Sequence, residues 1–103
     1  MKKPVKEKIL TLHPEGKTGV RIDLEKYNTI KDAIIKVLTK RKMITFEELA
    51  EEVVALLEKK FQGSVLWYYT TVKLDLEARK MIRRIPGSKP QQITFGKKST
   101  KNS

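Results

Sequence analysis

Apolar side chains recur at the spacing of an α-helix in three segments of this 103-residue chain. The spacing predicts a first helix from about Leu24 to Lys40, a second over residues 46–57 and a third from Val65 to about Lys80. In the third segment, four apolar residues fall on one side of a helix and should face the core. They are Val65, Tyr69, Val72 and Leu76.

Polar side chains that can cap a helix stand before each of these segments. Asp23 is a suitable N-cap for the first helix, and Ser64 is one for the third. Thr45 and Glu48 have the spacing of a capping box, in which each side chain accepts a hydrogen bond from the backbone amide of the other residue. The turn-forming residues 59–63 separate the second helix from the third.

Short apolar stretches outside the helices predict strands. Residues 10–12 and 20–22 alternate on either side of a segment rich in turn formers, which predicts an N-terminal hairpin or an extended arm. Residues 43–44 predict a very short strand between the first and second helices. Residues 82–85 and 91–95 predict a C-terminal hairpin, because both prolines of this region fall in the turn between them.

The order of the predicted elements is helix, short strand, helix, helix and hairpin. Two helices joined by a short Gly-containing turn form a helix-turn-helix, and the hairpin after them would be a wing. The sequence therefore predicts an α+β fold, mainly α: a winged helix-turn-helix with a short N-terminal arm or hairpin. The domain should span residues 9–95, with flexible basic ends at 1–8 and 96–103.

The net charge of +11 is unevenly distributed. Residues 43–58 carry 5 acidic and no basic side chains, whereas residues 59–103 carry 11 basic and 2 acidic ones. A cationic surface attracts polyanions, so nucleic acid is the expected partner. The segments 1–8 and 96–103 together carry +6, however, which leaves +5 for residues 9–95. Only the charge of residues 9–95 can belong to a shaped binding face.

Several other classes of protein are not expected. The chain has no cysteine, no apolar run long enough to cross a membrane, and no apolar stretch after its N-terminal residues like that of a secretory signal. We therefore expect a cytoplasmic protein without contact to a membrane.

Catalysis has little support in the sequence. His13 is the only histidine and lies in a predicted turn, so a histidine pair for a metal ion is not available. Residues 16–18 resemble the end of a phosphate-binding loop, but the upstream glycine of that pattern is replaced by Thr11. We expect no enzyme, no cofactor and no small-molecule ligand.

In helix-turn-helix proteins the second helix of the motif enters the major groove, and here this is the third helix of the chain. Its outer face offers hydroxyls, a lysine on one flank, an indole and a leucine, which predicts phosphate contacts and shape recognition more than base discrimination. The alternative for the two wing arginines is that they are solvated and pair with Glu77 or Asp75. The expected nucleic-acid contacts are Lys59, Lys60, Ser64, Thr70, Thr71, Lys73, Arg83, Arg84, Ser88 and Lys89.

Trp67 and Leu74 stand seven residues apart on the face of the third helix that should be exposed. They suggest a dimer contact or a stacking platform for unpaired bases. The alternative is that the N-terminal arm covers them through Leu10, Leu12 or Val20. The neighbouring Tyr68 and Tyr69 are expected at the edge of the core and within it.

Four motifs of the chain are distinctive. They are HPEGK (13–17), GVRID (19–23), WYxTxVKLDLEAR (67–79) and PGSKPQ (86–91). Together they resemble a family of small uncharacterised bacterial proteins, known as a domain of unknown function with a winged-helix fold. The resemblance covers residues 12–95 and implies the fold, but it implies no activity.

Residues 76–85 resemble, more loosely, the junction between helix and wing in winged-helix transcriptional regulators. In those regulators the residues that match Lys73, Arg84 and Lys89 contact DNA. This chain departs from them at Lys80, where they have a glycine, and it has no added ligand-sensing or dimerisation element. Both departures count against a repressor of that type.

The resulting hypothesis is a DNA-binding winged-helix protein, with a transcription-related role and with homodimerisation as an option. The first alternative is a protein-interaction module, because the acidic second helix lies beside the exposed Trp67 and Leu74. RNA is a third option and less favoured than DNA.

Overall fold

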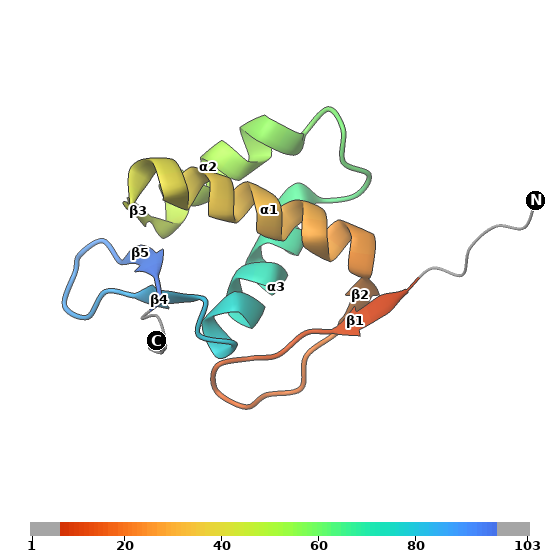
Figure 1. The fold of residues 1–103 in the computed structure, drawn as a ribbon, viewed down its shortest axis with the longest axis horizontal. Helices are drawn as coiled ribbons and strands as arrows, with labels where there is room; N and C mark the ends of the chain where they lie inside the picture. Colours follow the sequence, from red (N-terminus) through yellow and green to blue (C-terminus); the bar gives the residue numbers. More distant parts are fainter. Residues whose placement is uncertain (1–6, 97–103) are drawn as a thin grey trace, which may run out of the picture.

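The computed structural model describes residues 7–96, which form an α+β fold of three helices and two small sheets (Figure 1). The helices are α1 (Leu24–Arg41), α2 (Phe46–Leu57) and α3 (Val65–Ala78). The strands are β1 (Lys8–Leu10), β2 (Arg21–Asp23), β3 (Met43–Thr45), β4 (Ile82–Arg84) and β5 (Gln92–Phe95). Strand β1 starts inside the N-terminal segment predicted to be flexible. Residues 1–6 and 97–103 of the two predicted flexible ends lie outside the described residues.

Each helix begins directly after its predicted capping residue. The hydroxyl of Thr45 accepts a hydrogen bond from the N–H of Glu48 at 3.1 Å, and the hydroxyl of Ser64 accepts one from the N–H of Trp67 at 3.1 Å. Asp23 occupies the N-cap position of α1, without a side-chain hydrogen bond to the helix. Local side-chain chemistry therefore sets the first residues of α2 and α3.

Helix α3 ends at Ala78, two residues before the predicted end. Lys80 has a φ of 69°, in the left-handed region, and its N–H donates to the carbonyl of Glu77 at 3.0 Å. The N–H of Met81 donates to the carbonyl of Leu76 at 3.0 Å. These two bonds form a Schellman motif, which closes the helix and turns the chain toward β4.

Strands β1 and β2 pair in an antiparallel hairpin, so the prediction of a hairpin is confirmed over that of an arm. Beyond the strands, three hydrogen bonds join Thr11 and Val20. The Thr11 N–H donates to the Val20 carbonyl at 2.8 Å, and the Thr11 hydroxyl accepts from the Val20 N–H at 3.0 Å and donates to the Val20 carbonyl at 3.1 Å. A Cβ at Gly19 would lie 1.7 Å from the Thr11 carbonyl oxygen, so only glycine fits there. Strand β1 begins two residues earlier than the predicted segment 10–12, and β2 begins one residue later than the predicted segment 20–22.

The second sheet has the strand order β3-β5-β4, and all its pairs are antiparallel. Both the short strand after α1 and the C-terminal hairpin were predicted. In this sheet Arg84 lies opposite Ile93, which is fully buried, whereas Arg83 lies opposite Thr94. Cross-strand neighbours share a face of a sheet, so Arg84 faces the helices and Arg83 faces away from them.

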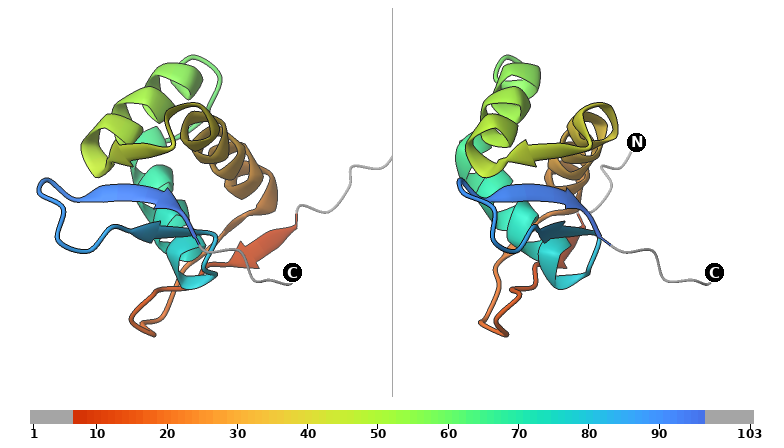
Figure 2. Two further views of the ribbon diagram at one scale, coloured as in Figure 1. Left: turned by 60° about the vertical axis from the view of Figure 1, so that its left-hand side comes forward. Right: turned by 90° about the vertical axis from the view of Figure 1, so that its left-hand side faces the viewer.

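One core lies between the three helices and the inner face of this sheet (Figure 2). Its largest fully buried side chain is Tyr69 of α3, whose ring centroid lies 5.2 Å from that of Phe46. Tyr68 is partly buried and packs against the core, as predicted. Among the described residues, none of the helices combines the length and apolar character that a membrane span needs.

Candidate nucleic-acid interface

The outer face of α3 is the surface that the sequence analysis assigned to nucleic acid. On this face Trp67 is 48% exposed and Thr70 is exposed, whereas Thr71 and Leu74 are partly buried. The first two turns of α3 are therefore open to a partner, and the following turn is open only in part.

Lys73 does not extend from α3 toward solvent. The residue is 6% exposed, and its Nζ lies 2.6 Å from Oε2 of Glu77. The same Nζ lies 4.9 Å from the centre of the Phe46 ring. The prediction of an accessible Lys73 is wrong, because the start of α2 covers this flank of the helix and Glu77 neutralises the charge.

Arg84 pairs with the same carboxylate, that of Glu77. Its Nε lies 3.2 Å from each oxygen of Glu77, and its terminal nitrogen lies 3.1 Å from Oε1. These hydrogen bonds raise the pKa of the Arg84 guanidinium. The alternative that Arg84 pairs with Glu77 is thus confirmed, and it follows from the register that turns Arg84 toward the helices.

Besides Arg84, whose side chain is 44% exposed despite its pairing with Glu77, four of the expected basic contacts are exposed. Arg83 and Lys89 lie on the hairpin of β4 and β5, and Lys59 and Lys60 lie in the loop before α3. These two groups stand toward opposite ends of α3 (Figure 1). The structure therefore divides the predicted cations into two exposed pairs, one before and one after the helix, and a third pair beside it, Lys73 and Arg84, that shares the single carboxylate of Glu77.

The two predicted serine contacts have roles within the chain. The hydroxyl of Ser64 caps α3, as described above. The hydroxyl of Ser88 donates to the carbonyl of Ile85 at 2.8 Å and accepts from the N–H of Gln92 at 2.9 Å. Ser88 therefore closes the turn that presents Lys89.

Asp75 of α3 forms a buried centre that the sequence analysis did not single out. The residue is 0% exposed, and its carboxylate accepts hydrogen bonds from the N–H of Leu12 and from Nε of Arg79, each at 2.8 Å. It also accepts one from the hydroxyl of Tyr27. Burial, together with this bond to Asp75, raises the pKa of Tyr27. One carboxylate thus joins the N-terminal hairpin, α1 and α3.

Tyr69 of α3 lies near the carboxylate of Glu77, whose side chain is buried. The hydroxyl of Tyr69 donates to the carbonyl of Phe46 at 2.9 Å. Burial raises the pKa of Tyr69, and the charge of Glu77 adds to this effect. The uncharged form of Tyr69 is therefore part of the packing between α2 and α3.

Trp67 and Leu74 have different surroundings. The contact of Leu12 with Asp75 places the N-terminal hairpin against the turn that contains Leu74, which is partly buried. Trp67 remains 48% exposed, and its ring meets that of Tyr68 edge-on at 5.0 Å. The alternative that the N-terminal arm covers both residues is therefore wrong for Trp67.

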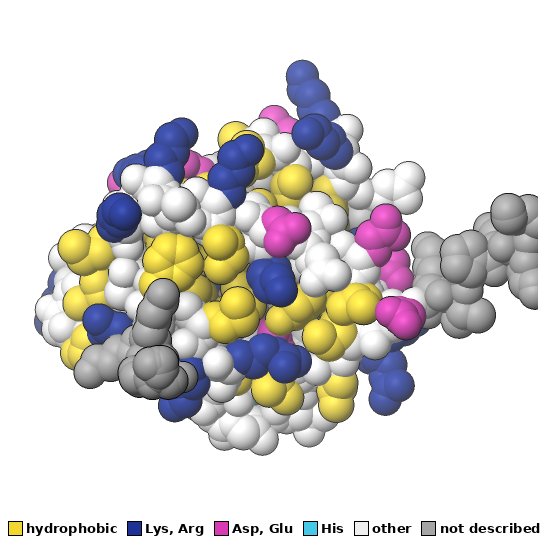
Figure 3. Space-filling model, viewed as in Figure 1, with side chains coloured by type: hydrophobic (Ala, Val, Ile, Leu, Met, Phe, Trp, Pro, Cys, Tyr) yellow, Lys and Arg dark blue, Asp and Glu magenta, His cyan; other side chains and the backbone are white. Residues whose placement is uncertain are grey.

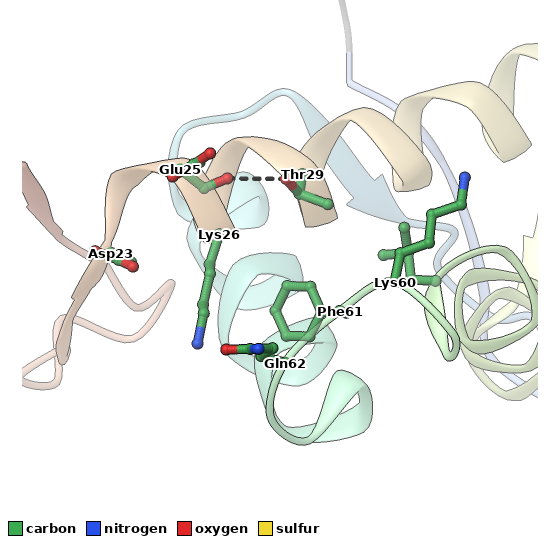
Figure 4. Close-up of a pocket in the computed structure, with 8 residues that line it drawn as sticks. Asp23, Glu25, Lys26, Thr29, Lys60, Phe61 and Gln62 are labelled. Carbon is green, nitrogen blue, oxygen red and sulfur yellow. Dashed lines mark hydrogen bonds between the residues drawn. The ribbon is translucent and has the colours of Figure 1, made fainter. Parts of the chain in front are cut away.

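A groove of about 460 Å³ lies between the start of α1 and the loop before α3 (Figure 4). The Phe61 ring lies between Lys26 and Lys60 in this view. Nζ of Lys26 lies 5.6 Å from the centre of the Phe61 ring and 5.3 Å from that of Tyr68. The lining residues are Asp23, Glu25, Lys26, Thr29, Leu57, Lys60, Phe61 and Gln62.

Sequence reasoning missed this groove because its two walls come from distant segments of the chain. The available signal was Phe61, an aromatic residue in an otherwise polar turn next to Lys60. For the buried ion pairs, the signal was the spacing of Lys73 to Glu77 and of Asp75 to Arg79, four residues apart on a helix.

The face in front in Figure 3 shows how charge is distributed around α1. Lys and Arg side chains are spread over it, with hydrophobic side chains between them, and acidic side chains lie near its middle as well as at its edges. This face is therefore mixed and does not form an uninterrupted cationic surface.

Other sequence features have plain local roles. Nδ1 of His13 accepts a hydrogen bond from the N–H of Glu15 at 3.1 Å, within the loop of the N-terminal hairpin. Within residues 7–96, no group of three or more metal-ligating side chains is suited to hold a metal ion.

Comparison with models of protein families gives one match, to a family of unknown function (DUF6958), over residues 8–93. A search among curated proteins finds no match.

Proposed function

The chain belongs to this family of unknown function, so its role must be argued from its own residues, and we propose that it is a winged-helix domain that binds duplex DNA. In this proposal α2 and α3 form the helix-turn-helix, and the hairpin of β4 and β5 is the wing. The element order and the sheet order β3-β5-β4 support it.

The observation that carries the proposal is the placement of exposed cations toward both ends of α3. Arg83 and Lys89 lie on the hairpin that follows one end of α3, and Lys59 and Lys60 lie in the loop that leads into the other. A helix of 14 residues is roughly 21 Å long. The major groove is about 12 Å wide. Cations at the two ends of such a helix have the spacing to reach phosphates on both sides of a groove.

The same structure argues against strong base readout. The open part of the outer face offers the indole of Trp67 and the hydroxyl of Thr70, and neither makes the paired hydrogen bonds of Arg, Asn or Gln. Lys73 and Arg84 are held by Glu77. We therefore propose a binding mode that depends on phosphates and groove shape, with an affinity that varies little with sequence.

Fluorescence anisotropy with labelled duplexes of unrelated sequence tests this function. We expect similar affinities for all duplexes and a log–log slope of affinity against salt of about −4, since each neutralised phosphate contributes about 0.9. Absence of binding at low salt contradicts the proposal. If the salt dependence of the affinity is unchanged after all four of these lysines and arginines are replaced, binding belongs to the basic chain ends instead.

A second candidate function rests on a separate observation. Leu66 and Trp67 are adjacent on the first turn of α3 and are 54% and 48% exposed. Neighbouring large apolar side chains at a surface are typical of protein contacts, here a second copy or another protein. Light scattering of the full chain and of Trp67→Ser separates this candidate, because only a protein contact predicts an association that the substitution abolishes.

A further inference from the structure

The groove between the start of α1 and the loop before α3 has the chemistry of a ligand site. Its volume of about 460 Å³ falls within the range of small-molecule pockets, which is about 300 to 1,000 Å³. The apolar part of its lining is Phe61 with Leu57, and the remaining lining side chains are polar or charged. A ligand that fits must therefore combine a flat apolar part with charged or hydrogen-bonding groups.

The lining specifies three properties of that ligand. The ring of Phe61 offers a surface for a flat aromatic group. Lys26 and Lys60, one on each side of this ring in Figure 4, offer positive charge to an anion. Glu25 adds a carboxylate to the lining, so the ligand also needs donors, and a second anionic group near it would be repelled.

From this combination we propose that the groove binds a nucleotide unit. The base stacks on Phe61, and ribose hydroxyls or base amines donate to Glu25. The phosphate is held by Lys60, because the amino group of Lys26 already lies against the rings of Phe61 and Tyr68. Aromatic stacking beside a basic groove is the general way in which proteins hold unpaired nucleotides. The exposed Lys59 next to Lys60 extends the positive charge beyond the groove and favours a phosphate over a carboxylate.

The local structure holds this site in shape. Gly63 has a φ of 107°, and a Cβ there would lie 3.4 Å from the Tyr68 ring. The ring of Tyr68 in turn meets the ring of Phe61 edge-on, with 5.1 Å between centroids. Phe61 is therefore supported from behind by the aromatic ring of Tyr68, so its orientation does not depend on a ligand.

The site shares Lys60 with the proposed duplex interface, whereas its other lining residues lie outside that interface. The unit can come from a free nucleotide or from an unpaired stretch of a strand. Titration of the full chain with adenosine monophosphate and with a single-stranded adenine oligonucleotide, followed by NMR of the backbone amides, distinguishes these sources. Tighter binding of the oligonucleotide indicates a strand, and equal binding per nucleotide indicates a free nucleotide. In both cases the amides of Lys26, Thr29 and Phe61 should shift.

Three variants test whether nucleotide binding occurs in the groove. Phe61→Leu keeps an apolar side chain and should weaken binding about tenfold, because stacking of one base contributes on the order of a tenfold affinity. Lys60→Gln should weaken binding several-fold, whereas its matched control Lys59→Gln, outside the lining, should have a smaller effect. Circular dichroism verifies that each variant is folded.

The outcomes are separable from those for duplex DNA. Replacement of both Arg83 and Lys89 by Gln should leave nucleotide binding unchanged while it weakens duplex binding. No shift with adenosine monophosphate or the oligonucleotide, or shifts confined to other elements, overturns the inference. Equal effects of Lys59→Gln and Lys60→Gln also overturn it, as does tighter binding of free phenylalanine, which would indicate an aromatic amino acid.

Discussion

The backbone N–H of Leu12 donates a hydrogen bond of 2.8 Å to the carboxylate of Asp75, a residue 63 positions later in the chain. This contact fixes the N-terminal hairpin to the helix that carries the candidate interface. Asp75 is fully buried and Tyr27 is 4% exposed, so water does not readily replace the carboxylate at the Tyr27 hydroxyl.

Replacement of Asp75 by Ala should destabilise the protein by about 3 kcal/mol, because it leaves the buried Tyr27 hydroxyl and the Leu12 amide without an acceptor and removes the ion pair of Arg79. The amide of Leu12 should lose its protection against hydrogen exchange before the core does. Chemical denaturation and exchange measurements check this. Asp32→Ala, at an exposed position of α1, is the control and should stay within about 0.5 kcal/mol.

Stability should fall as the pH rises above about 10, the ordinary pKa of tyrosine. The pKa values of Tyr27 and Tyr69 are raised in the folded protein, mainly by burial. The unfolded chain therefore releases these protons first, and the stabilisation, complete below pH 10, is lost with increasing pH. Each tyrosine contributes a slope of about 1.4 kcal/mol per pH unit.

Denaturation at several alkaline pH values measures this slope. Tyr69→Phe should reduce it by the share of one tyrosine, although the lost hydrogen bond to the Phe46 carbonyl lowers the stability at neutral pH. An unchanged slope in both Tyr69→Phe and Tyr27→Phe would show that these groups do not titrate on unfolding.

Replacement of Glu77 by Gln should tighten duplex binding while it lowers stability. The change releases Arg84 for a phosphate, so the magnitude of the salt slope should increase by about 1. It also leaves Lys73 buried without its counter-ion, at a cost of about 3 kcal/mol. Glu47→Gln removes the same charge from an exposed position of α2, so equal effects on the slope would contradict a specific release of Arg84.

Combined replacement of Arg83 and Lys89 by Gln should reduce the magnitude of the salt slope by about 2. The matched control replaces Lys36 and Lys40, which are exposed on α1 and outside the proposed interface. Anisotropy titrations at about 50 to 200 mM salt measure both. If the two double variants lose affinity equally, binding follows net charge and does not involve the wing.

Lys80→Gly should stabilise the protein by about 0.5 to 1 kcal/mol, since Lys80 adopts a left-handed φ that costs a residue with a Cβ about 1 kcal/mol or more. Thermal denaturation should show the increase. Lys40→Gly, inside α1, serves as the opposite control and should destabilise by about 1 kcal/mol.

The parts of the fold that were predicted correctly depend on local chemistry. Caps at Thr45 and Ser64, apolar periodicity along the helices, and prolines outside the C-terminal strands all act within a few residues. The end of α3 was missed because a lysine at position 80 gives no sign that it adopts the conformation of a glycine.

The site was predicted less well because its properties depend on contacts between distant segments. A helical projection places Lys73 on a flank of α3, but it does not show that Phe46 covers this flank. The register of the C-terminal hairpin decides that Arg84 faces Glu77 while Arg83 faces solvent. The groove at Phe61 needs the position of α1 relative to the loop before α3, which no local pattern contains.

The attachment of both terminal hairpins to α3 has a consequence for how the protein is made. The N-terminal hairpin is fixed to the helix through Asp75, and Glu77 receives its second cation only when Arg84 is present. A nascent chain therefore cannot fix its earliest hairpin to α3 until about three-quarters of the sequence has been made, and the pairing of Arg84 with Glu77 needs about four-fifths of it. The domain should form in a single late step, and fragments that end before β4 should be degraded and not accumulate.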